Sequence, residues 1–229
     1  MMTQKKPKHM PRIQSRLRHN IVEMPKEIRE CGGIVIWGRR IKSLVFTTDI
    51  AIIRNCNADA VLAVYPFTPQ QVISDSIISG SSIPVFCGVG GGTTQGNRSV
   101  LLATDAEAQG AMAVVVNAPM PDEDVAAIAK QVDIPIVTTV LDDQIDVDAR
   151  LAAGATIFNI SAAQDTPEVV RSIRSRYPDL PIIATGGPTG ETVLRTIEAG
   201  ANAITYTPPT TAELFSGIMK EYRNRKKLQ

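Results

Sequence analysis

Short apolar runs recur along the chain at nearly equal intervals, and the segments between them each carry a single apolar stripe. The runs are continuously apolar rather than alternating, which is typical of parallel strands that are covered on both faces. Strands are predicted over residues 43–47, 60–64, 84–87, 113–116, 135–138, 156–160, 182–184 and 203–206. The intervening segments space their apolar residues at the helical period, as helices do when one face packs on a sheet. The pattern therefore predicts eight strand–helix units.

Residues at the ends of these units support the same interpretation. Thr68-Pro69 and Thr166-Pro167 each place a capping hydroxyl before a proline in the first turn of a helix. Three glycines stand just before predicted strands, where helices commonly end on a residue with positive φ. They are Gly110, Gly154 and Gly200. Eight units of nearly equal length predict a closed (β/α)8 TIM barrel with a last helix over 212–225, and a doubly wound open sheet is the alternative.

Residues 1–42 fall outside the eightfold pattern and are predicted to form an N-terminal helix and hairpin extension. Residues 13–30 are compatible with a helix that is broken at Pro25, and residues 34–41 resemble a hairpin. We expect this arm to brace the N-terminal face of the barrel. The chain is therefore predicted to be one domain, with the arm over 1–42 and the barrel over 43–229.

Charge is distributed unevenly along the 229 residues, whose net charge is +1. Residues 1–18 carry +6 and residues 220–227 carry +4, so the middle of the chain carries −9. Because the body is acidic, we interpret the basic ends as solvated arms and do not expect binding to nucleic acid. No apolar stretch reaches the roughly 18 residues of a membrane span, and no secretory signal is recognised, so a cytoplasmic protein without membrane association is predicted.

The polar ends of the predicted strands indicate where a ligand would bind, because the carboxyl ends of barrel strands line the active sites of such proteins. Those with hydrogen-bonding groups include Asn117, Asn159, Thr185 and Thr207. Gly186 and Gly187 join a strand to a helix start, where the backbone can approach a phosphate or carboxylate and free N–H groups point at it. An alternative is that the glycines only form a tight turn. We predict a small anionic ligand there.

The segment after the last strand departs from this pattern. Pro208 and Pro209 have no N–H groups, although phosphate-binding barrels commonly use backbone N–H groups at this place. We therefore expect the hydroxyl group of Thr210, with those of its neighbours, to replace them. A second loop, over residues 88–98, is rich in glycine and is predicted to be either a lid whose Arg98 binds an anion or a flexible connector.

Candidates for catalysis are few. Asp49 is the carboxylate at a predicted strand end and is a candidate general acid or base, whereas Asp142 and Asp143 are better explained as helix caps. Cys87 is a candidate nucleophile, but the two histidines lie in the N-terminal arm and would not activate it. The three cysteines match neither a zinc site nor a disulfide framework, so no metal ligands are assigned. No cofactor is predicted, although a divalent metal or FMN stays open.

Several of these motifs resemble those of the class I aldolases that cleave 2-keto-3-deoxy-6-phosphogluconate, within the phosphate-binding TIM-barrel superfamily. They are Gly154-Ala155, the Thr185-Gly186-Gly187 turn and Ala199-Gly200-Ala201, with a weaker match at Thr68-Pro69. The resemblance implies a related barrel that keeps the phosphate turn. It places the Schiff-base lysine of that family on Asn159, its glutamate base on Ala63 and its substrate-binding arginine on Phe67. Because Asn159 cannot form an imine, the resemblance argues against a lysine-dependent aldolase.

Three functions remain open on these grounds. The first is an enzyme of the lyase, epimerase or isomerase type that acts on a small phosphorylated or carboxylated metabolite. The second is a ligand-sensing or regulatory barrel without catalysis, and the third is an FMN-binding protein. Barrels of this size often pair through their outer helices, so a homo-oligomer is also expected.

Overall fold

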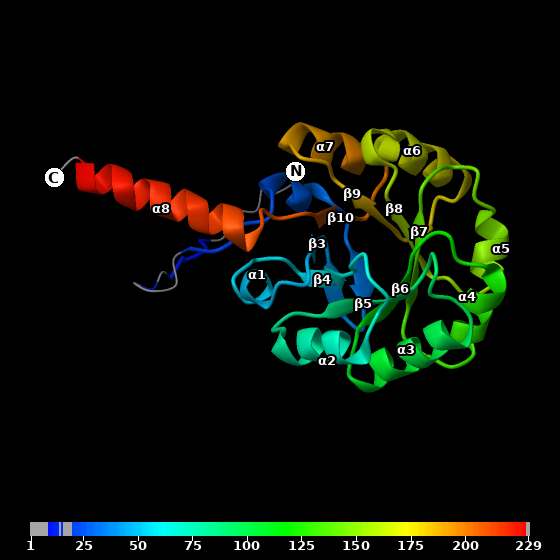
Figure 1. Ribbon diagram of the computed structural model, residues 1–229. Coiled ribbons are helices and arrows are strands. Elements are labelled where there is room, and N and C mark those ends of the chain that lie inside the picture. The colour runs from blue at the N-terminus through cyan, green and yellow to red at the C-terminus, as the bar shows by residue number, and fades with distance from the viewer. Residues whose placement is uncertain (1–8, 14, 16–19, 228–229) are drawn as a thin grey trace.

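Eight parallel strands close into a barrel in the computed structural model, which describes residues 9–13, 15 and 20–227, with side chains described as far as residue 224 (Figure 1). The strands are β3 (Ser43–Phe46), β4 (Ala60–Ala63), β5 (Val85–Gly90), β6 (Ala113–Val116), β7 (Ile136–Val140), β8 (Ile157–Ile160), β9 (Ile182–Thr185) and β10 (Ala203–Tyr206). The ring closes because β10 pairs with β3 as well as with β9. This confirms the predicted (β/α)8 fold and excludes the open sheet.

Helices alternate with the strands along the chain. They are α1 (Ile50–Arg54), α2 (Gln71–Gly80), α3 (Asn97–Ala108), α4 (Asp122–Ala129), α5 (Val147–Ala152), α6 (Thr166–Arg176), α7 (Gly190–Glu198) and α8 (Thr211–Lys227), with a short 3-10 turn, η2 (Ala163–Asp165), before α6. Helices α1 to α7 surround the barrel, whereas α8 points away from it (Figure 1). No helix in the described part of the chain has the length and apolar character that a membrane crossing needs.

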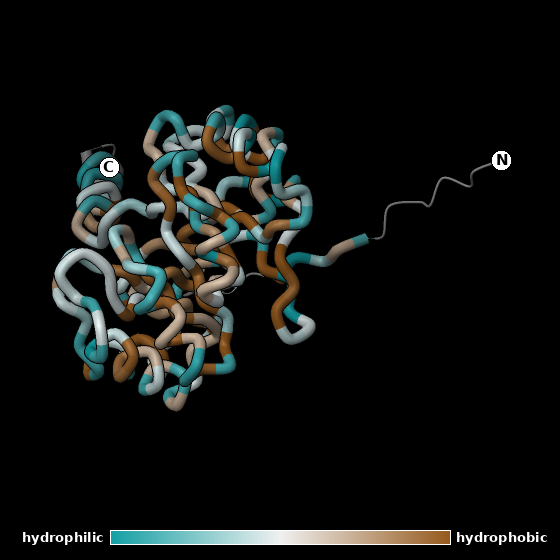
Figure 2. The backbone as a smooth tube through the Cα atoms, turned by 90° about the vertical axis from the view of Figure 1, so that its right-hand side faces the viewer, coloured by the Kyte–Doolittle hydropathy of each residue, from teal (hydrophilic) through white to brown (hydrophobic). Residues whose placement is uncertain are grey.

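Side chains alternate along each strand between the barrel interior and the helices outside. Leu44, Phe86, Val115, Val137 and Ile183 belong to a buried cluster that fills the interior. Their neighbours in the chain point outward and are buried under the helices in two further clusters. The barrel is therefore a packed core on both sides of the sheet, and the hydrophobic segments in Figure 2 run through its centre.

A hairpin closes the N-terminal end of the barrel, as predicted. It consists of β1 (Ile34–Ile36) and β2 (Arg39–Ile41), which pair antiparallel. Ile36 and Ile41 are buried in the same cluster as the barrel interior, together with Met112 next to the start of β6. The apolar residues of the hairpin therefore seal the end of the barrel that lies opposite the strand carboxyl ends.

The predicted helix over 13–30 forms only after the predicted break at Pro25, while residues 14 and 16–19, including His19, lie outside the described part. Only η1 (Lys26–Glu30), a five-residue 3-10 helix, follows Pro25. Before it the chain is extended: the Val22 N–H donates to the Asn55 carbonyl at 2.7 Å, and the Asn57 N–H donates to the Val22 carbonyl at 3.3 Å. Backbone pairing with the barrel takes the place of a helix here.

This N-terminal segment, residues 20–31, covers the outer wall where the barrel closes. Ile28 and Cys31 are buried in the cluster that contains Ile204, an outward residue of β10. Met24 packs against that cluster and also against the one that contains Val45, an outward residue of β3. The wall over β10 and β3 is thus occupied by residues that precede the barrel in the chain.

Two helix starts differ from the prediction. Helix α2 begins at Gln71, after Thr68-Pro69, and has no side-chain cap. Helix α6 has its proline in the first turn as expected, but Thr166 already lies inside the helix and its hydroxyl bonds to the turn before it. The glycines at helix ends are confirmed, with positive φ of 97°, 106° and 115° for Gly110, Gly154 and Gly200.

The predicted glycine-rich loop over 88–98 is partly a strand. β5 continues through Gly88, Val89 and Gly90, all of which are buried, and its register against β6 shifts between the two glycines. A Cβ on Gly90 would lie 2.2 Å from the Ser99 hydroxyl oxygen, so close packing requires the glycine. The run of glycines therefore reflects a bulged, crowded strand end as well as a loop.

Candidate active site

Inward-pointing residues at the carboxyl ends of the strands line a cavity of about 180 Å³ at the barrel mouth. Its polar lining consists of Asn117, Thr139, Asn159, Ser161, Thr185, Thr205 and Thr207, and its apolar lining of Phe46, Leu62 and Val64. None of these described residues carries a charge. The mouth therefore presents hydroxyl and amide groups on one side and an apolar wall on the other.

Hydrogen bonds link the polar residues of this mouth cavity into a chain. The Asn159 Nδ2 donates to the Thr139 hydroxyl at 3.4 Å, and that hydroxyl donates to Asn117 Oδ1 at 2.9 Å. The Thr185 hydroxyl lies 3.4 Å from that of Ser161. These contacts orient both asparagine amides, so the ring of groups is positioned before any ligand arrives.

Two polar atoms of the mouth cavity have no partner. Asn159 Oδ1 and the Thr205 hydroxyl oxygen are buried without a hydrogen bond. Leaving a buried polar atom unpaired costs about 1–3 kcal/mol, and most such atoms in proteins are paired. Both atoms belong to residues that line the same cavity, so a rotation of either side chain would offer its unpaired atom to a molecule bound there.

A groove of about 610 Å³ opens beside the mouth cavity and shares Thr185, Thr205 and Thr207 with it. Glu213 also lines this groove, and its carboxylate accepts hydrogen bonds from the Thr210 N–H and hydroxyl, both at 2.8 Å. These bonds hold the pKa of Glu213 below its usual value. Thr210, predicted to bind the anion, instead caps the start of α8, because its hydroxyl is bonded to Glu213.

The glycine turn is arranged differently from the expected phosphate site. The Gly186 N–H is already donated to the Thr205 carbonyl at 3.2 Å, and a Cβ at this position would lie 2.6 Å from Ile204 Cγ2. Gly187 has a φ of 76° and lines the groove. The carboxylate of Glu27 also lies close to Gly190, at the start of α7. Gly186 is therefore crowded by its neighbours and has its N–H engaged, and the Glu27 carboxylate already lies near the start of α7.

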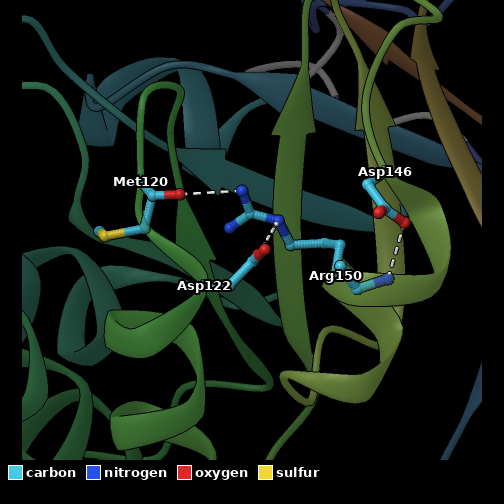
Figure 3. A network of polar contacts seen from close by, with 5 residues as sticks. Met120, Asp122, Asp146 and Arg150 are labelled. Carbon is cyan, nitrogen blue, oxygen red and sulfur yellow. Dashed lines mark hydrogen bonds and ion pairs between the residues drawn. The ribbon is translucent and has the colours of Figure 1, made fainter.

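A further cavity of about 230 Å³, lined in part by Arg150, shares Asn117 and Thr139 with the mouth cavity. The Arg150 Nε lies 3.0 Å from Asp122 Oδ1, and its Nη2 donates to the Met120 carbonyl at 2.8 Å (Figure 3). With a side chain only 13% exposed, Arg150 holds the loop before α4 in place. Sequence reasoning missed this residue, because it lies on a six-residue helix far from any predicted strand end.

Besides Gly186 and Thr210, three predicted site residues lie outside these cavities. The Asp49 carboxylate caps α1, accepting from the N–H groups of Ala51 and Ile52 at 2.8 and 3.3 Å, and it also accepts a hydrogen bond from the Thr211 hydroxyl. That last bond is the main cause of its lowered pKa. Asp49 therefore caps α1 and lines neither the mouth cavity nor the groove, and its catalytic role stays a prediction.

Cys87 and Arg98 are also misplaced by the prediction. Cys87 points outward from β5 into the cluster under the helices, and burial raises the pKa of its thiol. Arg98 is the second residue of α3 and is exposed away from the cavities described. The turn over 91–94 closes on itself, and its Gly92 N–H donates to the Pro119 carbonyl at 2.9 Å. The segment is thus fastened to its neighbouring loop by backbone hydrogen bonds, whereas a flexible connector would lack them.

Neither a scan against protein-family models nor a search of curated proteins finds a match for this chain. Solved structures do match. A phosphonopyruvate hydrolase in complex with oxalate and Mg²⁺ has a TM-score of 0.59 at 16% identity, covering 84% of each chain. A putative phosphonomutase from Burkholderia cenocepacia has a TM-score of 0.59 at 15% identity, covering 82% of this chain and 93% of that one. A mandelate oxidase variant with a monooxide FMN adduct has a TM-score of 0.60 at 18% identity, covering 77% and 68%.

At these identities the likeness establishes the fold. The proteins named are enzymes, but their reactions do not transfer to this chain on fold alone. The aldolase resemblance stays a prediction. In the structure Asn159, its lysine position, does line the mouth cavity, whereas Ala63, its glutamate position, points outward under the helices.

The residues of this chain show whether it could bind the Mg²⁺ or the FMN that two of these structures contain. Within the described residues no group of three or more His, Cys, Asp or Glu side chains converges on a metal site, and Asp142 and Glu213 line separate cavities. The phosphate of FMN would meet an engaged Gly186 N–H, two prolines and the Glu213 carboxylate. The donor set therefore fits neither group.

Proposed function

We propose that the barrel mouth binds a small, uncharged, polyhydroxylated metabolite through hydroxyl and amide groups. The observation that carries this proposal is the pair of unpartnered buried atoms, Asn159 Oδ1 and Thr205 Oγ1, in a cavity without a charged lining residue. Sugar-like molecules supply both donors and acceptors, and their carbon faces suit the apolar wall of Phe46, Leu62 and Val64. Hydrogen bonds to such a ligand would satisfy both orphaned atoms.

Phosphorylated or carboxylated metabolites, the class favoured by the sequence, are expected to bind more weakly than their neutral counterparts. An anion in the groove would lie near Glu213, and the lowered pKa of this residue keeps it negative at neutral pH. Arg150 does not compensate, because its charge is paired with Asp122. The preference for neutral ligands is therefore an electrostatic one.

An enzyme of the lyase, epimerase or isomerase type is the second candidate, supported by Glu213. Such reactions need a titratable group within hydrogen-bonding reach of the reacting atom. Glu213 opens on the groove that shares Thr185, Thr205 and Thr207 with the mouth cavity, and its lowered pKa keeps it ionised as a proton acceptor, although a weak one. A ligand that spans both cavities would meet it. Glu213→Gln is then expected to abolish turnover and to leave binding largely intact.

The test is a thermal-shift screen with matched pairs: sugars and their phosphate esters, hydroxy acids and their amides. A ligand at 100 times its dissociation constant adds about 2.7 kcal/mol to the free energy of unfolding, which raises the melting temperature by roughly 5–11 °C for a chain of this size. Larger shifts with the charged member of each pair would overturn the neutral-ligand proposal and restore the anionic one.

Thr205→Val locates the binding site, since it removes an unpartnered hydroxyl and keeps the shape. We expect the free protein to be as stable as the wild type or more so, and the ligand-induced shift to disappear. Thr196→Val is the matched control, because the Thr196 hydroxyl is equally buried but donates to the Thr192 carbonyl at 2.9 Å on α7. This control should lose about 1 kcal/mol of stability and keep the full ligand response.

A further inference from the structure

Helix α8 carries an apolar face that the barrel does not cover. Phe215, Ile218 and Tyr222 lie one helical turn apart and are 65%, 37% and 55% exposed. Leu214 packs against the cluster under α1 and α2, and beyond it the helix leaves the barrel (Figure 1). Spacing of three and four residues puts these side chains on one side of the helix. The result is a continuous apolar stripe on a projecting arm.

The chain's own barrel has no place for this stripe. In a regular barrel the last helix would pack on the wall over the last and first strands. Here that wall is covered by the N-terminal segment, whose Met24, Ile28 and Cys31 pack into the clusters that contain the outward residues of β10 and β3. Helix α8 would have to displace this segment in order to fold back.

The helix also needs a partner for its own stability. Most helices in proteins are stabilised mainly by packing their apolar face rather than by intrinsic propensity. Gly217, in the middle of α8, weakens it further. At its base the helix is held by the Thr210–Glu213 cap and by the bond from Thr211 to Asp49. Packing of the apolar stripe against a partner must therefore supply the rest of the stability of α8.

Charge indicates what that partner is. By sequence, residues 43–210 contain 8 basic and 18 acidic residues, a charge of −10, whereas residues 211–227 contain five and two, a charge of +3. An arm of one copy is therefore attracted to the body of another, while the same acidic body is repelled by an anionic membrane or nucleic acid. A second copy of this chain offers an apolar stripe that can pack on the first stripe, and an acidic body that attracts the basic arm.

We propose that α8 pairs antiparallel with α8 of a second copy and forms a two-fold symmetric dimer. In this register Phe215 of each copy faces Tyr222 of the other, and the Ile218 and Met219 side chains of both copies meet at the axis. Aromatic pairing at the two ends and aliphatic packing at the centre then bury the stripe. Each basic end, with Lys220 and Arg223, lies along the start of the other helix, near Glu213.

The first test is the mass of the full chain in solution by light scattering after size exclusion, at tens of micromolar. The wild type should have twice the 24.7 kDa of one chain. Ile218→Glu should raise the dissociation constant of the dimer by roughly 100-fold or more, because each dimer would bury two unpaired carboxylates. Leu101→Glu is the matched control, since Leu101 is a 60% exposed apolar residue on α3, and it should remain a dimer.

Cross-linking tests the orientation. Ile218→Cys should form a disulfide-linked dimer on oxidation, and a mixture of Phe215→Cys and Tyr222→Cys chains should cross-link far more than either alone. Leu101→Cys should not cross-link above the background of the natural cysteines. A wild type that is monomeric at these concentrations, a dimer that withstands Ile218→Glu, or a monomer that binds phosphatidylglycerol vesicles through α8 would each overturn the proposal. None of these outcomes depends on the ligand of the mouth.

Discussion

Gly186→Ala separates packing from ligand binding as the reason for a glycine at the end of β9. A Cβ at this position would lie 2.6 Å from Ile204 Cγ2 and 3.0 Å from Val193 Cγ2. Carbon atoms pack at about 3.5–4.0 Å, so β10 or α7 would have to move by roughly 1 Å. If Gly186 serves packing, the substitution must destabilise the fold even when no ligand is present.

The size of the effect follows from this overlap. Forcing an extra methyl group into a packed core costs about 1–3 kcal/mol, which lowers the melting temperature of a chain of this size by about 2–12 °C. Gly217→Ala is the matched control. A Cβ at Gly217 meets no atom within 4 Å, and alanine is favoured over glycine in a helix, so this variant should gain up to about 1 kcal/mol.

The assay is urea unfolding of the two glycine variants and of a double-mutant cycle. Ile204→Ala removes the crowding Cγ2, so we expect it to cost at least about 0.5 kcal/mol less in the Gly186→Ala protein than in the wild type. If Gly186→Ala unfolds like the wild type but no longer binds ligand, the packing explanation is refuted and the glycine serves the ligand.

Three further outcomes are expected. Burial raises the pKa of Cys31 from 9.0 to about 11, so the native state holds this proton more tightly and stability should fall as pH rises from about 9 to 11; Cys31→Ala should flatten that part of the profile in urea titrations. Asp49→Ala should lose about 1 kcal/mol of unfolding free energy through the α1 cap, a loss that shrinks as low pH protonates the wild-type carboxylate, and it should leave ligand affinity unchanged by calorimetry. Arg150→Met should lose about 1–3 kcal/mol in the same titrations, since the Met120 carbonyl and Asp122 lose their partner; an unchanged midpoint would show that this loop needs no clamp.

The sequence predicts the barrel well, because buried parallel strands are continuous apolar runs that hydropathy alone reveals. The strands over residues 113–116 and 203–206 have the same limits in the structure as in the prediction. Strand β5 was predicted too short, because glycines such as Gly88 and Gly90 are typical of loops. The structure shows why glycine continues the strand: at Gly90 the Ser99 hydroxyl leaves no room for a side chain. The end of β5 is therefore set by tertiary packing and not by the local strand propensity of its residues.

The mouth was predicted in part. Asn117, Asn159, Thr185 and Thr207 line the mouth cavity and Gly187 lines the groove beside it, because residues at or just after strand ends were expected there. The prediction placed Cys87 at the mouth, but its side chain points outward. Successive residues of a strand point to opposite faces, and here Phe86 faces the barrel interior, so Cys87 faces the helices. The sequence alone does not show which of the two alternating sets of residues faces the interior.

Other errors concern which partner satisfies a polar group. Asp49 and Thr210 carry side chains that suit either a ligand or a helix start, and the structure assigns both to caps. Thr205 was overlooked because it lies inside the last strand, between Ile204 and Tyr206. The run was predicted as an apolar strand, and the sequence did not show that the Thr205 hydroxyl points into the barrel. Its missing hydrogen bond becomes visible only when the neighbouring strands are in place.

A crystal structure of the protein with the ligand that gives the largest thermal shift tests the proposed binding site most directly. We expect ligand donor and acceptor atoms within hydrogen-bonding distance of Asn159 Oδ1 and the Thr205 hydroxyl, with a carbon face against Phe46 and Leu62. A ligand bound elsewhere, with those two atoms still unpartnered, would contradict the proposed role of the mouth.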